Sequence, residues 1–303
     1  MSLNIGKMFH IVHVSEALRP LDAWYDDVFV PRRGIMDNNY LAHEMREGSL
    51  LAIGDTVIET MAPHPGPGSE MLPVGKFFAR FGRHLHSLAW YTDDVGSIWE
   101  RLVDQGIRVI HYGPADRPVE GDIYTHPKDT LTQLEFFQPP AATGGPPDPR
   151  FDPTWPEQWA ASANPLGVQR LAYATVVARD MDRATSIYVD VLGGTIIDEG
   201  SSALTGTVNT YVAIGPETVV ELAVPTDAGS LAGRDLAALG ESCHALAFTV
   251  TDLAHVAGHL EATGIAILAR DDTTILADPV GTYGAPLRFT TRAVPGDPRD
   301  RPA

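Results

Sequence analysis

The stretch LAIGDTVIETMAP at residues 51–63 returns with small changes as VAIGPETVVELAVP at residues 212–225. A second pair lies further along: HSLAWYTDDVGSIWERLVDQGI at residues 86–107 matches HALAFTVTDLAHVAGHLEATGI at residues 244–265. The offsets of the two pairs differ by only a few positions, which loops of unequal length can absorb. Such internal similarity indicates a duplication. The chain of 303 residues therefore contains two copies of one module.

A shorter unit repeats within each module. Four segments carry apolar residues at positions i, i+3, i+4 and i+7, the spacing of one helix face packed on a sheet. These residues are Leu21, Trp24, Tyr25 and Val28; Val95, Ile98, Trp99 and Leu102; Ala184, Ile187, Tyr188 and Val191; Leu253, Val256, Ala257 and Leu260. Asp93 or Asp94, Asp180 and Asp252 are candidate N-caps, and Pro20 suits a first turn. Extended segments surround each helix, so the sequence predicts an α+β fold of four βαβββ units.

Proline density predicts where the modules are divided. Residues 139–165 contain eight prolines, a density that argues against any helix or central strand. We expect Trp155 and Trp159 to hold part of this linker to a domain surface. The predicted divisions are an N-terminal domain at 1–138, a linker at 139–166, a C-terminal domain at 167–292 and a frayed tail at 293–303.

Composition excludes several classes of partner. The 22 Lys and Arg against 39 Asp and Glu leave a net charge of −17, and no basic cluster is available for a nucleic-acid backbone. No run approaches 18 apolar residues, so we expect no membrane span. Cys243 is the single cysteine, and the N-terminus does not resemble a signal peptide. These features favour a cytoplasmic protein whose partner is a small-molecule substrate.

The repeated units resemble the vicinal oxygen chelate superfamily. Its members include glyoxalase I, methylmalonyl-CoA epimerase, extradiol ring-cleavage dioxygenases and the bleomycin resistance proteins. The motifs that carry the resemblance are RDMDRATSIYVDVLGG at 179–194, a looser copy SEALRPLDAWYDDVF at 15–29, the Ile58-Glu59 and Val220-Glu221 pairs, and LEF at 134–136. The resemblance covers nearly the whole chain outside the linker and tail. It implies a glyoxalase/extradiol dioxygenase-like fold of two tandem paired modules, in which curled sheets form cups with helices outside, but it does not specify a reaction.

The resemblance also implies one divalent metal per cup, bound by His, Glu or Gln, His and Glu from the first, fourth, fifth and eighth strands. In the N-terminal half these positions hold His10, Glu59, His86 and Glu135. Such a mixed set suits Zn²⁺, Ni²⁺, Co²⁺, Mn²⁺ or Fe²⁺. In the C-terminal half Tyr173 and Arg288 stand at two ligand positions, so we expect this cup to be metal-free. Eight of the 11 histidines precede residue 150, which agrees with this asymmetry.

The direction of His86 depends on strand register. Regular alternation places His86 with Leu88 and Trp90 on one face, which would turn Ser87 into the cup instead. A one-residue bulge would restore His86, and His84 is a substitute.

Three further residues or segments have alternative interpretations. Glu59 persists as Glu221 in a half that has lost other ligands, so it is a ligand, a base or a structural residue. His13 is out of phase with His10 and is expected to be structural or exposed. The loop at 66–69 is a candidate lid.

These features favour a metal-dependent enzyme that acts on a small substrate with two adjacent oxygens. In that hypothesis the reaction is isomerase, epimerase or lyase chemistry through an enolate-like intermediate, with Glu59 or Glu135 as general base. One alternative is an extradiol ring-cleavage dioxygenase. Another is a metal-free protein that sequesters a small ligand, as bleomycin resistance proteins do. A monomer and a homodimer are both compatible with the duplication.

Overall fold

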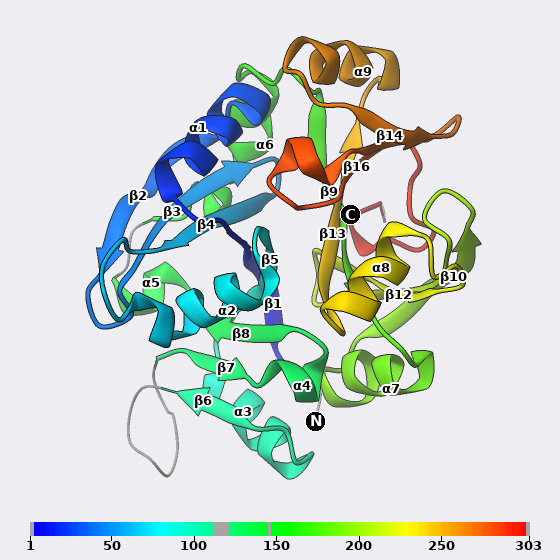
Figure 1. The fold of residues 1–303 in the computed structure, drawn as a ribbon. Coiled ribbons are helices and arrows are strands. Elements are labelled where there is room, and N and C mark those ends of the chain that lie inside the picture. The colour runs from blue at the N-terminus through cyan, green and yellow to red at the C-terminus, as the bar shows by residue number, and fades with distance from the viewer. Residues whose placement is uncertain (1–2, 112–120, 145–146, 301–303) are drawn as a thin grey trace.

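The computed structural model describes residues 3–111, 121–144 and 147–300 (Figure 1). The strands of the N-terminal module are β1 (Ile5–Val14), β2 (Arg32–Leu41), β3 (Arg46–Ile53), β4 (Thr56–Pro63), β5 (His84–Thr92), β6 (Val109–His111), β7 (Ile123–Thr125) and β8 (Gln133–Phe137). Those of the C-terminal module are β9 (Val168–Val177), β10 (Thr195–Ser202), β11 (Thr207–Ile214), β12 (Thr218–Pro225), β13 (Ser242–Val250), β14 (Ile267–Arg270), β15 (Thr274–Ala277) and β16 (Leu287–Thr290).

Within the described residues these strands form two eight-stranded sheets of identical topology. The first sheet has the order β2-β3-β4-β1-β5-β8-β7-β6, and the second has the order β10-β11-β12-β9-β13-β16-β15-β14. The first and fourth strands of each module pair in parallel, as do the fifth and eighth. Figure 1 shows the two modules side by side, each with helices around its sheet. The predicted α+β fold of two tandem modules is confirmed.

All four predicted helices are present among the described residues. They are α1 (Leu18–Phe29), α3 (Val95–Asp104), α7 (Met181–Thr185) and α9 (Leu253–Ala262). Asp94, Asp180 and Asp252 accept a backbone hydrogen bond at the starts of α3, α7 and α9, as predicted. The third helix differs from the expectation in one respect: it continues past α7 as a π-helical segment, η3 (Ser186–Val191). No described helix is long and apolar enough to cross a membrane.

The predicted helix faces lie in a hydrophobic core that runs through both modules. Phe29 at the end of α1 lies 5.3 Å from Phe248 of β13 and 6.2 Å from Phe289 of β16, measured between ring centroids. Trp90 of β5, fully buried, donates a hydrogen bond to Thr218 of β12 (3.2 Å). The helix-facing side of each sheet thus packs in the shared core, and the opposite side of the sheet forms the cup.

Two helices that the sequence analysis did not predict cover the cups. They are α2 (Pro73–Phe81) and α8 (Leu231–Ala238), each between the two units of its module. Val74, Phe77 and Phe78 of α2 pack on Val12 and Val14, which lie on the cup side of β1. The candidate lid at residues 66–69 leads through the turn η1 (Ser69–Met71) into α2. The cover of the N-terminal cup is therefore a packed helix.

The prediction that the linker contains no helix is wrong. It contains α5 (Pro140–Thr143), η2 (Pro149–Phe151) and α6 (Trp155–Ala160), each with a proline at its first or second position. Proline is tolerated there because no intrahelical partner is available for the missing N–H. The two tryptophans do hold the linker: Trp155 donates to the carbonyl of Gly54 (2.7 Å) and Trp159 to that of Val168 (2.8 Å).

An Asp-Pro-Arg tripeptide follows each module at residues 148–150 and 297–299. In the first copy Arg150 pairs with Asp148, and neither side chain is exposed. Its guanidinium also donates to the carbonyls of Met8 (2.9 Å), Phe9 (2.8 Å) and Asp55 (3.0 Å). The linker is thereby bonded to β1 beside the cup.

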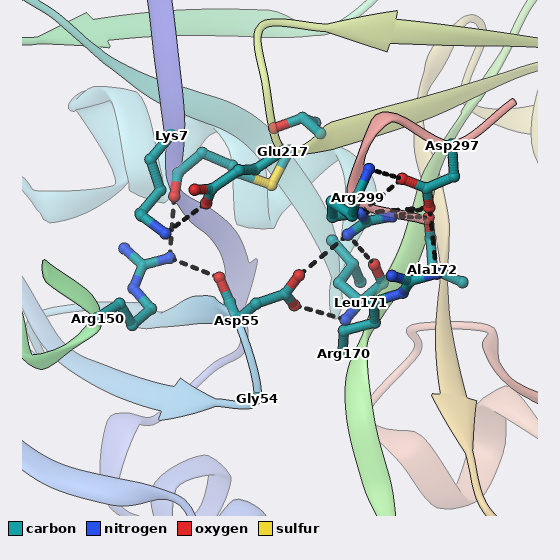
Figure 2. Close-up of polar contacts among 12 residues, drawn as sticks. Lys7, Gly54, Asp55, Arg150, Arg170, Leu171, Ala172, Glu217, Asp297 and Arg299 are labelled. Carbon is teal, nitrogen blue, oxygen red and sulfur yellow. Dashed lines mark hydrogen bonds and ion pairs between the residues drawn. The ribbon is translucent and has the colours of Figure 1, made fainter. Parts of the chain in front are cut away.

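In the second copy Arg299 pairs with Asp297 and donates to the carbonyls of Leu171 (2.7 Å) and Ala172 (3.0 Å) of β9. It also donates to the carboxylate of Asp55 (3.0 Å), so one residue of the β3–β4 turn contacts both arginines (Figure 2). The expected frayed tail is therefore bonded to the fold at Arg299. The repeat of the tripeptide is a sequence signal for this contact, and residues 301–303 of the predicted tail lie outside the described residues.

Candidate functional site

Three of the four predicted ligands meet in the N-terminal cup. His10 on β1 has its Nε2 3.2 Å from Oε2 of Glu59 on β4 and 3.4 Å from Oε2 of Glu135 on β8. All three side chains are buried, with at most 5 % of any residue exposed. Strand pairing sets this arrangement, because β4 lies on one side of β1 while β5 and then β8 lie on the other.

His86 turns toward the same cup because β5 contains a bulge. Leu85 pairs with His13 and Leu88 with Ile11, so β5 has one residue more than β1 between these pairs. Leu85 and Leu88 both lie in the core, which leaves His86 and Ser87 on the cup side. The ring of His86 lies 4.5 Å from that of Phe77 in the covering helix α2. Both His86 and Ser87 therefore face the cup, although the sequence offered them as alternatives.

The electrostatics of His86 and Glu135 suit a ligand pair. Burial lowers the pKa of His86 to about 4, so its imidazole is neutral at pH 7, and its Nδ1 is buried without a hydrogen-bond partner. Burial would raise the pKa of Glu135, but the contact with His10 and the nearby Ser87 hydroxyl hold that pKa at about 2. A neutral imidazole and an ionised carboxylate are the forms that bind a metal. His84, the substitute, instead contacts its neighbour's carbonyl through Nδ1 (2.7 Å).

The sequence analysis missed the groups that orient the two glutamates. Arg46 on β3 donates to Oε1 of Glu59 (3.0 Å), and its Nε donates to Glu44. Gln133 donates to Oε1 of Glu135 (2.9 Å). Each glutamate therefore has one oxygen held by a side-chain donor, while its Oε2 faces His10. Gln133 lies two residues before Glu135 on the same strand, so period-two alternation was a usable signal.

Negative charge accumulates around this cup. Burial and the charge of Glu135 raise the pKa of Asp122 to about 6. Glu44 in the β2–β3 turn and Glu59 on β4 contribute further negative charge near Tyr124. Burial first and then these carboxylates also raise the pKa of Tyr124. Among the described side chains here, carboxylates outnumber the single guanidinium of Arg46. A buried surplus of carboxylates is costly unless a cation compensates it.

The donor types fit a divalent metal. Donor atoms bonded to one ion at about 2.0–2.2 Å lie about 3.0–3.5 Å apart, and both His10–carboxylate distances fall in that range. Both ring nitrogens of His10 are buried without a hydrogen-bond partner. Within the described ranges, however, no group of three or more His, Cys, Asp and Glu side chains has the arrangement of a ready metal site. The cup thus supplies suitable donors, and binding would require them to close further.

The C-terminal cup has different chemistry at equivalent positions. Arg288 pairs with Ala247 as Glu135 pairs with Ala89, which confirms that arginine stands at the position of a glutamate. Its Nη2 donates to Oε2 of Glu221 (2.8 Å), and the guanidinium lies over the ring of Tyr173. At the centre of the C-terminal cup a guanidinium therefore stands where the N-terminal cup has the carboxylate of Glu135.

Two residues outside the ligand set have structural roles. His13 is fully buried, with Nδ1 2.9 Å from the hydroxyl of Tyr25 and Nε2 2.9 Å from the carbonyl of Tyr283. This confirms the structural alternative for His13. Cys243 is buried in the core, and burial raises the pKa of its thiol to about 12. A thiol in that state is not a nucleophile at neutral pH.

Comparison with known proteins agrees with the fold. A family model described as the glyoxalase/bleomycin resistance protein/dioxygenase superfamily matches residues 170–278. The chain therefore contains a domain of this superfamily, and the N-terminal sheet repeats its topology. No curated protein matches the sequence.

Two solved structures are similar to the chain to different extents. A variant of 4-hydroxymandelate synthase from Streptomyces coelicolor superposes with a TM-score of 0.66 at 15 % identity, covering 99 % of each chain. Methylmalonyl-CoA epimerase from Mycobacterium tuberculosis has 20 % identity and a TM-score of 0.40, covering 43 % of this chain and 92 % of its own. The first likeness establishes the two-module fold, and at this identity it establishes nothing further.

Proposed function

We propose that the N-terminal cup is the active site of a metal-dependent enzyme for a small substrate with two adjacent oxygens. The observation that carries the proposal is the convergence of two carboxylate oxygens on Nε2 of His10 in a buried, acidic cup. His10, Glu59, His86 and Glu135 would hold the metal. When bound, a divalent ion supplies Lewis-acid stabilisation to a developing enolate oxygen.

The chain's own residues supply orientation, a dry environment and a proton carrier. Arg46 and Gln133 donate to Oε1 of Glu59 and of Glu135, respectively. The Oε2 atoms of both glutamates therefore stay directed toward His10. The rings of Phe9 and Phe137 lie 4.4 and 5.5 Å from the ring of His10 and keep water from it. The carboxyl of Asp122, with its pKa near 6, can carry a proton at neutral pH. This set favours isomerase, epimerase or lyase chemistry.

Metal analysis of the full chain, purified without a histidine tag, tests the proposal. We expect about one divalent ion per chain in the wild type after dialysis, and loss of that ion in His10→Ala and Glu135→Gln. The matched controls are His255→Ala and Glu261→Gln on the exposed side of α9, which should keep the metal. Circular dichroism verifies that each variant is folded. Absence of metal in the wild type under every loading condition would refute an enzyme of this type and favour a metal-free ligand-binding protein.

The ring-cleavage dioxygenase is the second candidate, and the Arg46–Glu59 ion pair favours it. If Arg46 keeps Glu59 from the metal, then His10, His86 and Glu135 remain. Two histidines and one carboxylate with open positions are typical of non-haem iron oxygenases. Glu59→Gln separates the candidates, because it should weaken metal binding at least tenfold in a four-ligand site and leave it nearly unchanged in a three-ligand site. Oxygen uptake with catechol by the iron-loaded protein is the accompanying assay.

A further inference from the structure

The C-terminal cup is hollow at its centre. Two cavities of about 70 and 270 Å³ both have Glu221 and Arg288 in their walls. Tyr173 and Tyr211 line the smaller cavity, and residues of the covering helix α8 line the larger one. This space corresponds by duplication to the candidate site in the N-terminal cup, but its side chains differ.

The charges at the centre of this cup cancel. Arg288 and Glu221 are almost completely buried and form an ion pair. Both oxygens of Glu221 are already engaged, because Oε1 accepts from the hydroxyl of Tyr211 (2.8 Å) and Oε2 accepts from that of Thr175 (2.6 Å) as well as from Arg288. A charged ligand at the centre would lack a free counter-charge, and burying an unpaired ion is costly. The centre therefore favours a neutral ligand.

Three groups remain to bind that ligand. His244 lines the larger cavity and its Nδ1 is 2.8 Å from the carboxylate of Asp235, an arrangement that places the proton on Nδ1 and leaves Nε2 as an acceptor. Asn209 lines the smaller cavity, and its Oδ1 is buried without a hydrogen-bond partner. Arg288 has Nη1 in only a long contact, 3.5 Å from the hydroxyl of Tyr173. The cavities thus present one donor and two acceptors.

We propose that the C-terminal cup is a second, metal-independent site that binds a neutral aromatic molecule that carries hydroxyl groups. A hydroxyl both donates and accepts, so it matches Asn209 or His244 on one side and Arg288 on the other. The rings of Tyr173 and Tyr211, with centroids 5.2 Å apart, and Leu204 offer apolar surface to the body of the ligand. The site does not depend on the function proposed for the N-terminal cup.

Three probes of equal size and different charge test the site. They are 4-hydroxybenzyl alcohol, 4-hydroxybenzoate and 4-hydroxybenzylamine, each titrated into the chelator-treated full chain and followed by ligand-observed NMR. We expect saturable binding of the neutral alcohol and weaker binding of both ions. Asn209→Leu should weaken binding of the alcohol about fivefold, the equivalent of about 1 kcal/mol, and His244→Phe by a similar factor. Thermal unfolding verifies that both variants are folded.

The matched control is Glu135→Gln in the other cup, which should leave binding of the alcohol unchanged. No saturable binding of the alcohol, tighter binding of either ion, or an unchanged affinity in both Asn209→Leu and His244→Phe would overturn the proposal. So would loss of binding in Glu135→Gln, because the probe would then occupy the N-terminal cup. Because chelator treatment removes metal from the protein before the titrations, failure here is distinct from failure of the metal-dependent function.

Discussion

Replacement of Arg150 by methionine should be among the most destabilising changes in this protein. The side chains of Arg150 and Asp148 are both fully buried. The guanidinium also satisfies the carbonyls of Met8, Phe9 and Asp55, from β1 and the β3–β4 turn. Methionine fills part of the space but donates nothing. The variant therefore leaves a buried carboxylate unpaired and removes a donor from three carbonyls.

The expected loss follows from those contacts. Removing one partner of a buried ion pair costs about 3–5 kcal/mol, a large part of the roughly 5–15 kcal/mol that stabilises a typical domain. The equivalent Arg299 is 11 % exposed in its side chain, so solvent can reach part of its network. Because solvent compensates the lost hydrogen bonds there, we expect about 1–3 kcal/mol for Arg299→Met. We therefore predict that Arg150→Met lowers the free energy of unfolding more than Arg299→Met does.

Urea denaturation followed by tryptophan fluorescence and far-ultraviolet circular dichroism measures these losses. If Arg150→Met does not fold, Arg150→Lys keeps the charge but loses the planar fork, and should cost about 1–3 kcal/mol. Asp148→Leu combined with Arg150→Met should recover part of the loss, since no carboxylate is then left unpaired. A cost below about 1 kcal/mol for Arg150→Met, or a cost no greater than that of Arg299→Met, would refute the reasoning.

Three further predictions concern stability. Burial lowers the pKa of His13 from 6.5 to about 4, so between these pH values the unfolded chain binds more protons than the folded chain. The contribution of His13 to the free energy of unfolding is therefore complete above pH 6.5, and it falls by up to about 3 kcal/mol as the pH drops toward 4. Urea titrations at several pH values should show this slope, and His13→Gln should reduce it without abolishing it, because burial lowers the pKa of His86 in the same way. Arg288→Met should cost about 3–5 kcal/mol because Glu221 is left unpaired, and Arg288→Met with Glu221→Met should cost less. Asp252→Ala should cost about 1 kcal/mol in thermal unfolding through loss of the N-cap of α9.

Much of the fold could be predicted because its signals are local or duplicated. The spacing of Leu253, Val256 and Leu260 determines which face of α9 is buried whatever the rest of the chain does. The repeat aligned His10 with Tyr173 and Glu135 with Arg288, and the strand registers confirm that alignment. The sequence therefore identified which strands supply the candidate site and which half lacks its acidic set.

Tertiary structure decided the direction of His86 and the surroundings of the glutamates. The bulge that turns His86 into the cup exists only in the pairing of β5 with β1, so alternation along one strand could not reveal it. Arg46 lies far from Glu135 in sequence, and only the sheet order brings the two to the same cup. The sequence by itself determined the modules, the helices and the candidate ligands, because periodicity and duplication are properties of the chain. Which side chains face one another was decided by strand pairing, because that depends on contacts between distant residues.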